Sequence, residues 1–407
     1  MIKFNCERKM IFLRNVGTVV RGIRTPIIKE HDDLASIVVD SLMKAKESEN
    51  FEFRDRDIVA ITEAVVGISE GNYCTCDDIA TDIKEKFNNP EDLGIVFPIL
   101  SRNRFSLILR GIARSTKKLY VQLSFPSDEV GNAILDEDKL DESKFDLGSV
   151  ITEEDYFKYF GDFLHPFTGI NMIKFYKELI ENEGCTPVFI LSNKVTDILN
   201  YTNNVINCDI HTRLKTKKVL ASKGAKVYGL FEIMNHSVNG SGFNPEYGLL
   251  GSNKSTEERL KLFPKEGDKV INEVQKELKK LTGKNIEVMV YGDGAFKDPV
   301  GKIWELADPV VSPFYTDGLI GTPNEIKLKF VSDNKFPDLR GNELKEAIKE
   351  EIRKKEKNLK GQMITQGTTP RRLTDLIGSL CDLTSGSGDK GTPVVFIQGY
   401  FDNLADE

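Results

Sequence analysis

The sequence predicts an α+β protein in which mixed, partly antiparallel sheets pack against helices. Three observations support this fold class. Runs rich in β-branched residues alternate with segments of helical periodicity along the chain. The expected strands 106–110 and 119–125 are too close in sequence for a crossover helix, which favours antiparallel pairing over a doubly wound sheet. Hydrophobic residues at 40% and charged residues at 29% are typical of a folded globular protein.

The individual elements follow from the same patterns. Helices are expected where apolar residues recur every three to four positions, and Ser255 ahead of Glu257 and Glu258 indicates where one of them begins. Strands are expected where short β-branched runs are bounded by turn residues. In chain order the predicted elements are helix 32–46, strands 58–62, 106–110 and 119–125, helix 169–182, strands 187–191 and 226–234, helices 256–262 and 268–281, strand 286–291, helices 342–360 and 371–383, and strand 393–398.

The length of 407 residues predicts two domains or one domain with a large insertion, because one hydrophobic core seldom organises so long a chain. An acidic stretch at 136–146 and a stretch at 235–253 rich in Gly, Asn and Ser are typical of loops and can bound a middle insertion. The expected division is a core formed by residues 1–139 and 285–407, with residues 140–284 as an inserted α/β segment or second domain.

The bulk composition excludes several classes of protein. A formal net charge of -7 and a pI near 5.5 do not favour a nucleic-acid partner. No apolar run approaches the roughly 20 residues that cross a bilayer, so we expect a cytoplasmic protein without membrane contact. The six cysteines are scattered, and Cys74 and Cys76 lack a second Cys or His pair at metal-ligand spacing. We expect reduced thiols without a bound metal.

The segment 384–393 is the most informative stretch for chemistry. Its glycines formally satisfy G-x-G-x-x-G, but the order helix, loop, strand is the reverse of the order in a dinucleotide site. Successive glycines still allow backbone N–H groups to converge on an anion, and Ser385, Ser387 and Lys390 add donors and positive charge. The segment therefore predicts a phosphate-binding loop, with a flexible surface loop as the alternative.

Two further segments place acidic residues at the ends of apolar strands. Asp293 stands between glycines after 286–291, and Asp128 and Asn132 follow 119–125. Carboxylates in such positions suit a hard cation that bridges nucleotide phosphates. The alternative for each is a turn residue that caps its own backbone. The four histidines lack the H-E-x-x-H spacing of zinc proteases, so a zinc-protease hypothesis has no support.

The order of these segments resembles that of the γ-glutamyl ligases that act on the deazaflavin coenzyme F-420. Residues 22–34, GIRTPIIKEHDDL, are similar to that family's G-L-P-L-I-K-E-G-D-D-L opening. Residues 55–71 are similar to its strand and S-K-A-E-G turn, and residues 128–132 and 291–294 to its two metal segments. Residues 338–344 and 384–399 are similar to its D-L-x-G-R-E-L and G-E-G-G-D-G-I-P-x-V-V-V-R-G segments.

The resemblance implies a γ-glutamyl ligase-like fold in an intertwined homodimer. It also implies a GTP- or ATP-dependent enzyme that activates a small-molecule carboxylate as an acyl phosphate, which the amine of L-glutamate or a related amino acid then attacks. Mg²⁺ or Mn²⁺ would serve the nucleotide, with K⁺ as an additional candidate. By position, the nucleotide contacts would be Thr25, Pro26, Ile27, Ile28, Asn132, Gly386, Ser387, Gly388, Asp389 and Lys390, and the metal ligands Asp128 and Asp293.

Departures from the family pattern leave alternatives open. Ile68 stands at the lysine of the family turn, Gly294 at the threonine of the second metal segment, and Ser387 at the acidic residue of the glycine loop. A catalytically inactive nucleotide-binding regulatory protein is therefore one alternative, and a kinase that never ligates is another. A folate γ-glutamyl ligase is a third, because folates also carry a glutamyl γ-carboxylate. The missing positive charge could come from Lys29, Lys254 or Lys390.

We expect the middle segment, residues 140–284, to determine acceptor specificity, because it lacks a counterpart in the family pattern. Ser252, Asn253 and Lys254 precede the helix expected at 256–262, where they could meet an anionic substrate at the helix N-terminus. An ordered structural loop is the alternative.

Overall fold

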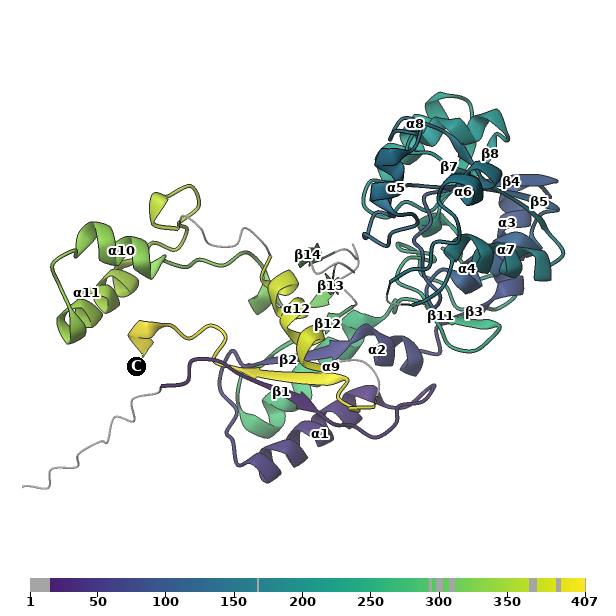
Figure 1. The fold of residues 1–407 in the computed structure, drawn as a ribbon. Coiled ribbons are helices and arrows are strands. Elements are labelled where there is room, and N and C mark those ends of the chain that lie inside the picture. The colour runs from purple at the N-terminus through teal and green to yellow at the C-terminus, as the bar shows by residue number, and fades with distance from the viewer. Residues whose placement is uncertain are drawn as a thin grey trace, which may run out of the picture.

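The computed structural model of the chain describes residues 15–166, 168–292, 295–297, 303–306, 312–365, 372–385 and 389–406. In these segments the chain is an α+β protein with mixed sheets and packed helices, as predicted. Figure 1 shows two separate units. We call the unit around a five-stranded sheet, formed by both ends of the chain, the core unit. The unit around a six-stranded sheet is the inserted unit.

The core sheet has the order β1-β16-β2-β12-β15, so the first and last strands of the described residues are neighbours. Strands β2 and β12 pair in parallel and the other pairings are antiparallel. The three central strands are apolar and buried on both faces, which explains why they read as continuous hydrophobic runs. The strands are β1 (Val19–Ile23), β2 (Ile58–Thr62), β12 (Glu287–Tyr291), β15 (Phe314–Tyr315) and β16 (Val394–Gln398).

Helices cover both faces of the core sheet because alternate strand residues point to opposite sides. One face packs on α1 (Leu34–Glu49), α2 (Glu63–Ser69) and α9 (Gly267–Thr282), and the other on α12 (Leu373–Ser385). A small helical arm extends from the core unit on the side away from the inserted unit (Figure 1). The arm and the remaining short elements are α10 (Leu328–Lys335), α11 (Gly341–Lys354), β13 (Ala295–Lys297), β14 (Ile303–Leu306), and the 3₁₀ helices η3 (Asp317–Leu319), η4 (Met363–Thr365) and η5 (Leu404–Asp406).

The inserted sheet has the order β6-β7-β5-β4-β8-β9, and all pairings from β7 to β9 are parallel. Helices α3, α4 and α7 cover one face, and α8 with the 3₁₀ helix η1 covers the other. The strands are β4 (Asp92–Val96), β5 (Lys118–Leu123), β6 (Ile151–Thr152), β7 (Thr186–Leu191), β8 (Asn204–Asn207) and β9 (Lys226–Gly229). The helices are α3 (Cys76–Phe87), α4 (Ser106–Arg114), α5 (Glu137–Glu142), α6 (Glu153–Tyr159), α7 (Met172–Asn182), α8 (Arg213–Ser222), η1 (Val195–Asn200) and η2 (Leu230–Glu232).

The predicted strand 106–110 is wrong, because these residues begin helix α4. Seven of the nine residues of α4 are buried, and the polar face of the helix is limited to Arg110 and Arg114. A short apolar run of this kind cannot be assigned by periodicity alone. The error also hid the topology, since α4 is the crossover that makes β4 and β5 parallel neighbours. Within this unit the sheet is doubly wound, although the chain as a whole is α+β.

The predicted helix 256–262 is also wrong. The segment forms a turn and strand β11 (Arg259–Lys261), which pairs with β10 (Asn253–Lys254) and with β3 (Tyr73–Thr75). Tertiary pairing with β3 overrides the local capping signal, because a segment of seven residues gains little from helix propensity. The helix N-terminus expected after Ser252, Asn253 and Lys254 therefore does not exist. Similarly, the strand expected at 226–234 ends at Gly229 and continues into η2.

The chain passes between the two units at Asn72 and Phe263. The Asn72 carbonyl accepts from the Leu262 N–H at 2.8 Å, and its side-chain amide donates to the Phe263 carbonyl at 2.8 Å. The Asn72 amide oxygen accepts from the Phe243 N–H at 2.9 Å. This division differs from the boundaries expected at 139/140 and 284/285. Strands β3 to β5 lie in the inserted unit, and α9 lies in the core unit.

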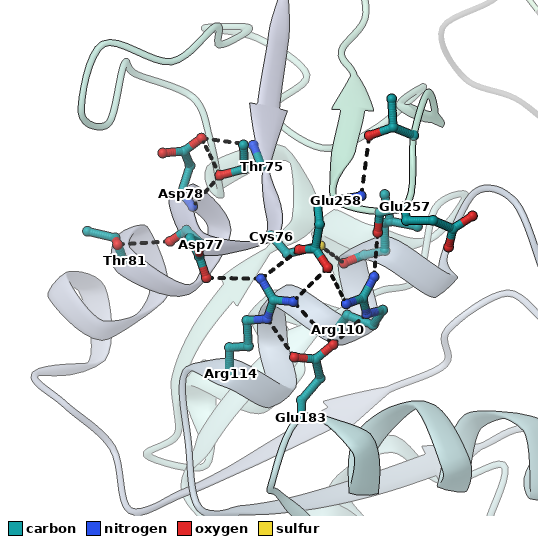
Figure 2. Close-up of polar contacts among 12 residues, drawn as sticks. Thr75, Cys76, Asp77, Asp78, Thr81, Arg110, Arg114, Glu183, Glu257 and Glu258 are labelled. Carbon is teal, nitrogen blue, oxygen red and sulfur yellow. Dashed lines mark hydrogen bonds and ion pairs between the residues drawn. The ribbon is translucent and has the colours of Figure 1, made fainter.

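A network of ion pairs fastens the turn between β10 and β11 to the inserted unit (Figure 2). Arg114 of α4 donates to Glu183 at 2.6 Å and to Glu258 of the turn at 3.0 Å. Arg110, one helical turn earlier, contacts the same two carboxylates. Burial opposes ionisation of Glu183, but the hydrogen bonds from Arg114 and Arg110 outweigh it and lower the Glu183 pKa.

We predict that Glu183→Gln lowers the free energy of unfolding by about 2 kcal/mol at pH 7, because two guanidinium groups lose a charged partner. The lowered pKa of Glu183 means that its contribution is present above about pH 4.5 and is lost as the pH falls through the folded-state pKa. Urea titrations at several pH values should show the difference from the unsubstituted protein shrinking below pH 4.5.

The control is Glu178→Gln, which changes an exposed carboxylate on the neighbouring helix α7 and should alter stability little at any pH. A Glu183→Gln effect that is the same at pH 3 and pH 7 would contradict the role of the ionised carboxylate.

Candidate functional site

A cavity of about 830 Å³ lies in the core unit where β1, α1 and the segment before β16 meet. Its walls carry four cationic side chains and several hydroxyl groups, against one carboxylate. The lining residues are Arg21, Gly22, Ile23, Arg24, Thr25, Pro26, Ser41, Lys44, Ala45, Ser48, Glu49, Lys390 and Thr392. We call this cavity the cationic pocket.

Pairing of the two ends of the chain creates the cationic pocket. Strands β1 and β16 are antiparallel with Ile23 opposite Val394, so the residues after β1 meet the residues before β16. The Thr25 N–H donates to the Gly391 carbonyl at 3.3 Å. The structure therefore brings Thr25 and Pro26 together with Lys390 in one cavity.

The other predicted nucleotide residues have different positions. Ile28 packs in the core beneath the sheet, and Ile27 is 84% exposed beside it. Asp389 is exposed next to Lys390. Gly386, Ser387 and Gly388 lie outside the described residues.

Three of the four cationic residues of the pocket, Arg21, Arg24 and Lys44, were not among the residues predicted from the sequence. Arg21 is held in place because it donates to the Gln398 side chain at 2.8 Å and its guanidinium lies 4.7 Å from the centre of the Phe51 ring. Arg24 and Lys44 are exposed at the rim. Ile68, which stands at the lysine position of the family turn, packs its side chain against the core.

A signal for Lys44 was present in the sequence. Ser41, Lys44, Ala45 and Ser48 follow the spacing of one helix face, and that face is polar where the opposite face of α1 is buried. Of the proposed substitutes for the missing lysine, Lys390 lines the pocket. Lys254 lies in the inserted unit and pairs with Glu257 at 2.7 Å.

Asp128 and Asn132 follow β5 of the inserted sheet, whereas the cationic pocket is lined by residues of the core unit. The Asp128 carboxylate accepts from the backbone N–H groups of Leu100, Val130 and Asn132 and from the Asn132 side-chain amide, at 2.8 to 3.1 Å. It is 7% exposed, and burial raises its pKa while these four donors oppose the increase. In this geometry Asp128 caps its own turn, which is the alternative to a metal ligand given in the sequence analysis.

The second expected metal ligand, Asp293, lies outside the described residues, as does Gly294. Among the described residues, Asp82, Glu85 and His236 bring ligand atoms within 4.8 Å of one another. Asp82 already contacts the Lys86 ammonium and accepts from the Met234 N–H at 2.7 Å. This group lies in the inserted unit, and a lysine already supplies positive charge to its buried carboxylate.

Comparison with known proteins places these observations in a family. A family model described as F420-0:Gamma-glutamyl ligase matches residues 22–399, which span both segments of the core unit and the whole inserted unit. No curated protein matches the chain. In the part of the chain that the structure describes, the helices are too short or too polar to span a membrane.

We predict that Asp128→Asn lowers the free energy of unfolding by about 2 to 3 kcal/mol, because the amide N–H₂ would face donors that now bond to a carboxylate. Thermal unfolding with and without Mg²⁺ measures this effect, and the loss should be equal in both. Asp138→Asn, an exposed change nearby, is the control. Unchanged stability without Mg²⁺, together with loss of stabilisation by Mg²⁺, would contradict the turn-capping role.

Proposed function

The chain belongs to the F420-0:gamma-glutamyl ligase family, and we propose that it joins L-glutamate, or a related amino acid, to a carboxylate of a small-molecule acceptor. The reaction would consume GTP or ATP. The cationic pocket supports this nucleotide dependence, because it is lined by hydroxyl groups and by the cationic side chains of Arg21, Arg24, Lys44 and Lys390. Cationic and hydroxyl donors of this kind suit the phosphates of a nucleotide.

The proposed chemistry explains why a nucleotide is needed. A carboxylate is a poor electrophile, so one of its oxygens first attacks the γ-phosphorus and the nucleoside diphosphate leaves. The amino-acid amine then attacks the acyl carbon of the resulting acyl phosphate. Inorganic phosphate departs, the nitrogen loses a proton and the amide remains. Negative charge on the transferred phosphoryl group requires nearby positive charge.

The cationic pocket offers residues for each binding task. Arg24, Lys44 and Lys390 would pair with phosphate oxygens, since all three side chains are exposed to the cavity. Arg21 would act as a fixed donor, because Gln398 and Phe51 already restrict its guanidinium. The Gln398 amide in turn donates to the Glu52 carbonyl at 2.9 Å and to Asp57 at 3.1 Å, which adds rigidity.

Dependence on Mg²⁺ or Mn²⁺, with K⁺ as an additional ion, is part of the proposal. The arrangement of Asp128 does not fit a metal ligand, because four N–H donors surround its carboxylate. The steps above are therefore assigned to cationic side chains alone. We also propose that the protein is a homodimer and that it is cytoplasmic. Light scattering of the purified protein tests the homodimer.

Alternative functions share the binding step and differ in the product. A folate γ-glutamyl ligase would use the same chemistry on another acceptor. An inactive regulatory protein would bind nucleotide without turnover, and a kinase would release a phosphorylated acceptor. The departures at Ile68, Gly294 and Ser387 motivate the inactive alternative.

Mass spectrometry of one set of reactions separates these functions. The purified chain receives GTP or ATP, Mg²⁺ or Mn²⁺, L-glutamate, and either the deazaflavin precursor or a folate. The proposal predicts an acceptor that gains glutamyl residues, with nucleoside diphosphate and phosphate released only when acceptor and glutamate are both present. Nucleotide binding without any amide product would support the regulatory alternative instead.

We predict that Lys44→Gln and Arg24→Gln each weaken GTP or ATP binding by about tenfold, because each removes one charged partner of the phosphates. Isothermal titration measures the change. Lys46→Gln is a matched control on the same helix, since Lys46 pairs with Glu52 at 2.8 Å and does not line the pocket. Equal affinity in all three variants would show that nucleotide binds elsewhere.

A further inference from the structure

A second cavity of the core unit, of about 590 Å³, is lined by α9, the start of β12, and β15 with η3. Because β15 is the edge strand of the core sheet, we call this cavity the edge pocket. Its lining combines charged side chains of both signs with side-chain amides. The lining residues are Asp268, Ile271, Asn272, Gln275, Lys276, Lys279, Asn285, Glu287, Tyr315, Thr316, Asp317 and Gly318. The volume is within the range of small-ligand sites.

The edge pocket is separate from the cationic pocket, because the two cavities lie near opposite ends of β2. Glu287 of the edge pocket is opposite Ile58, the first residue of β2. Ile23 of the cationic pocket is opposite Val394, which in turn is opposite Ile61 near the end of β2. The two linings share no residue. A ligand can therefore occupy one pocket while the other is empty.

Glu287 is the one buried charged residue in the lining of the edge pocket, and it is 9% exposed. Its Oε2 accepts from the Thr316 hydroxyl and from the Gly318 N–H, the latter at 3.2 Å. Its Oε1 lies against Gly318, where a Cβ would come within 2.1 Å of that oxygen. In the part of the chain that the structure describes, Oε1 accepts no hydrogen bond and no lysine or arginine pairs with this carboxylate. One oxygen of a buried carboxylate therefore remains for a ligand.

A buried carboxylate without a cation is unfavourable, and another buried glutamate of this protein shows the usual solution. Glu63 is 3% exposed and contacts the ammonium group of Lys261. Charges that leave water are normally paired in this way, because desolvation disfavours the ionised form. Glu287 lacks such a counterpart among the described residues, yet it lines an open cavity. A cationic group of a ligand would supply the missing charge.

A ligand ammonium group fits Glu287 better than a metal ion does. Mg²⁺ and Ca²⁺ take six or more ligands, most of them oxygens. Among the described residues, Asp82, Glu85 and His236 form the one group of three side chains close enough to share an ion, and Glu287 is not part of it. An ammonium group has three N–H donors, so one carboxylate oxygen and neutral amide oxygens are enough to bind it.

Positive charge on the α9 wall of the edge pocket comes from Lys276 and Lys279, which lie one turn apart. Both side chains are exposed, and neither forms an ion pair with a carboxylate of the described residues. The wall itself is fixed to the sheet, because Gln275 Nε2 donates to the Ile286 carbonyl at 2.9 Å. The edge pocket thus presents lysines on α9 and a carboxylate oxygen on β12 to the same space.

We propose that the edge pocket binds a free amino acid as its zwitterion, with the ammonium group on Glu287 Oε1 and the carboxylate on Lys276 and Lys279. The side-chain amides of Asn272 and Asn285 also line the cavity and can bond a polar side chain of the ligand. Complementary charges at the two walls make a zwitterion the ligand chemistry that this set recognises. The site goes beyond the proposed function, because it requires neither nucleotide nor turnover.

Calorimetric titration of the full chain with L-glutamine, in the absence of nucleotide, tests the proposal. L-glutamine carries the two charges of the zwitterion and a neutral side chain, so its binding reports on those charges. We expect saturable binding of L-glutamine and no binding of N-acetyl-L-glutamine, which lacks the ammonium group. Equal binding of the two compounds, no binding of L-glutamine, or displacement of L-glutamine by Mg²⁺ would each overturn the proposal.

Glu287→Gln distinguishes a ligand-binding carboxylate from a purely structural one. The glutamine side chain keeps an oxygen for the Thr316 hydroxyl and the Gly318 N–H, but it removes the charge. L-glutamine should therefore bind at least about tenfold more weakly. Thermal stability should not fall, because the free protein loses a buried charge that lacks a cation. Lower thermal stability together with unchanged affinity for L-glutamine would contradict the assignment.

The double variant Lys276→Gln with Lys279→Gln tests the other wall of the edge pocket. It should weaken L-glutamine binding by about tenfold or more, because the ligand carboxylate loses its charged partners. The matched control is Lys280→Gln with Lys284→Gln, which removes the same charge from residues that pair with other carboxylates and do not line the pocket. Equal weakening in both double variants, or weakening by Lys44→Gln of the cationic pocket, would contradict the assignment. Since no step requires turnover, failure here leaves the ligase proposal standing, and the reverse also holds.

Discussion

The arrangement of this protein depends on the contact between Asn72 and Phe263, where the chain leaves the core unit and returns to it. The residues between them form a whole second unit, yet β2 before it and β12 after it must be parallel neighbours in one sheet. Asn72 meets this constraint because its backbone carbonyl, side-chain N–H and side-chain oxygen bond three different segments. Nearby, the buried ion pair between Glu63 of α2 and Lys261 of β11 joins the same two units. An aspartate at position 72 would lack the donor for Phe263, and a leucine would lack both side-chain bonds.

Because the two units are joined at Asn72 and Phe263, the core unit forms the cationic pocket from its own residues. The cationic pocket is built from the two ends of the chain, because it needs β1 beside β16 and α1 against them. The three-stranded sheet β10-β11-β3 contains β3 and β11, which are the strands next to Asn72 and Phe263 in sequence. The network around Arg110 and Arg114 holds the outer turn of that small sheet, so it stabilises the connection without taking part in either site (Figure 2). Family membership accounts for ligase chemistry.

The sequence predicted those features that depend on local pattern. Strands β2, β12 and β16 and helices α1, α9 and α12 were found because burial produced long apolar runs or clear amphipathic faces. Helix α4 was missed because its first residues form a short, mostly buried apolar run, and β11 was missed because its partner β3 is distant in sequence. The sequence did not decide the role of Asp128, since an aspartate at the end of a strand suits a metal ligand and a turn cap equally well. The helix spacing indicates that Lys44 lies on the polar face of α1, but no local pattern shows that this face lies beside β1 and Arg24. Thr25 and Lys390 were brought together by family resemblance, not by spacing.

The central claim is that nucleotide phosphates bind in the cationic pocket of the core unit. Hydrogen–deuterium exchange of the full chain, with and without GTP or ATP and Mg²⁺, tests this most directly because it reports on both units at once. The account predicts slower exchange of backbone amides in residues 21–26, 41–48 and 389–392, with little change in the loops after β4 and β8. Protection confined to residues 97–104 and 208–212 would contradict it and would place the nucleotide in the inserted unit.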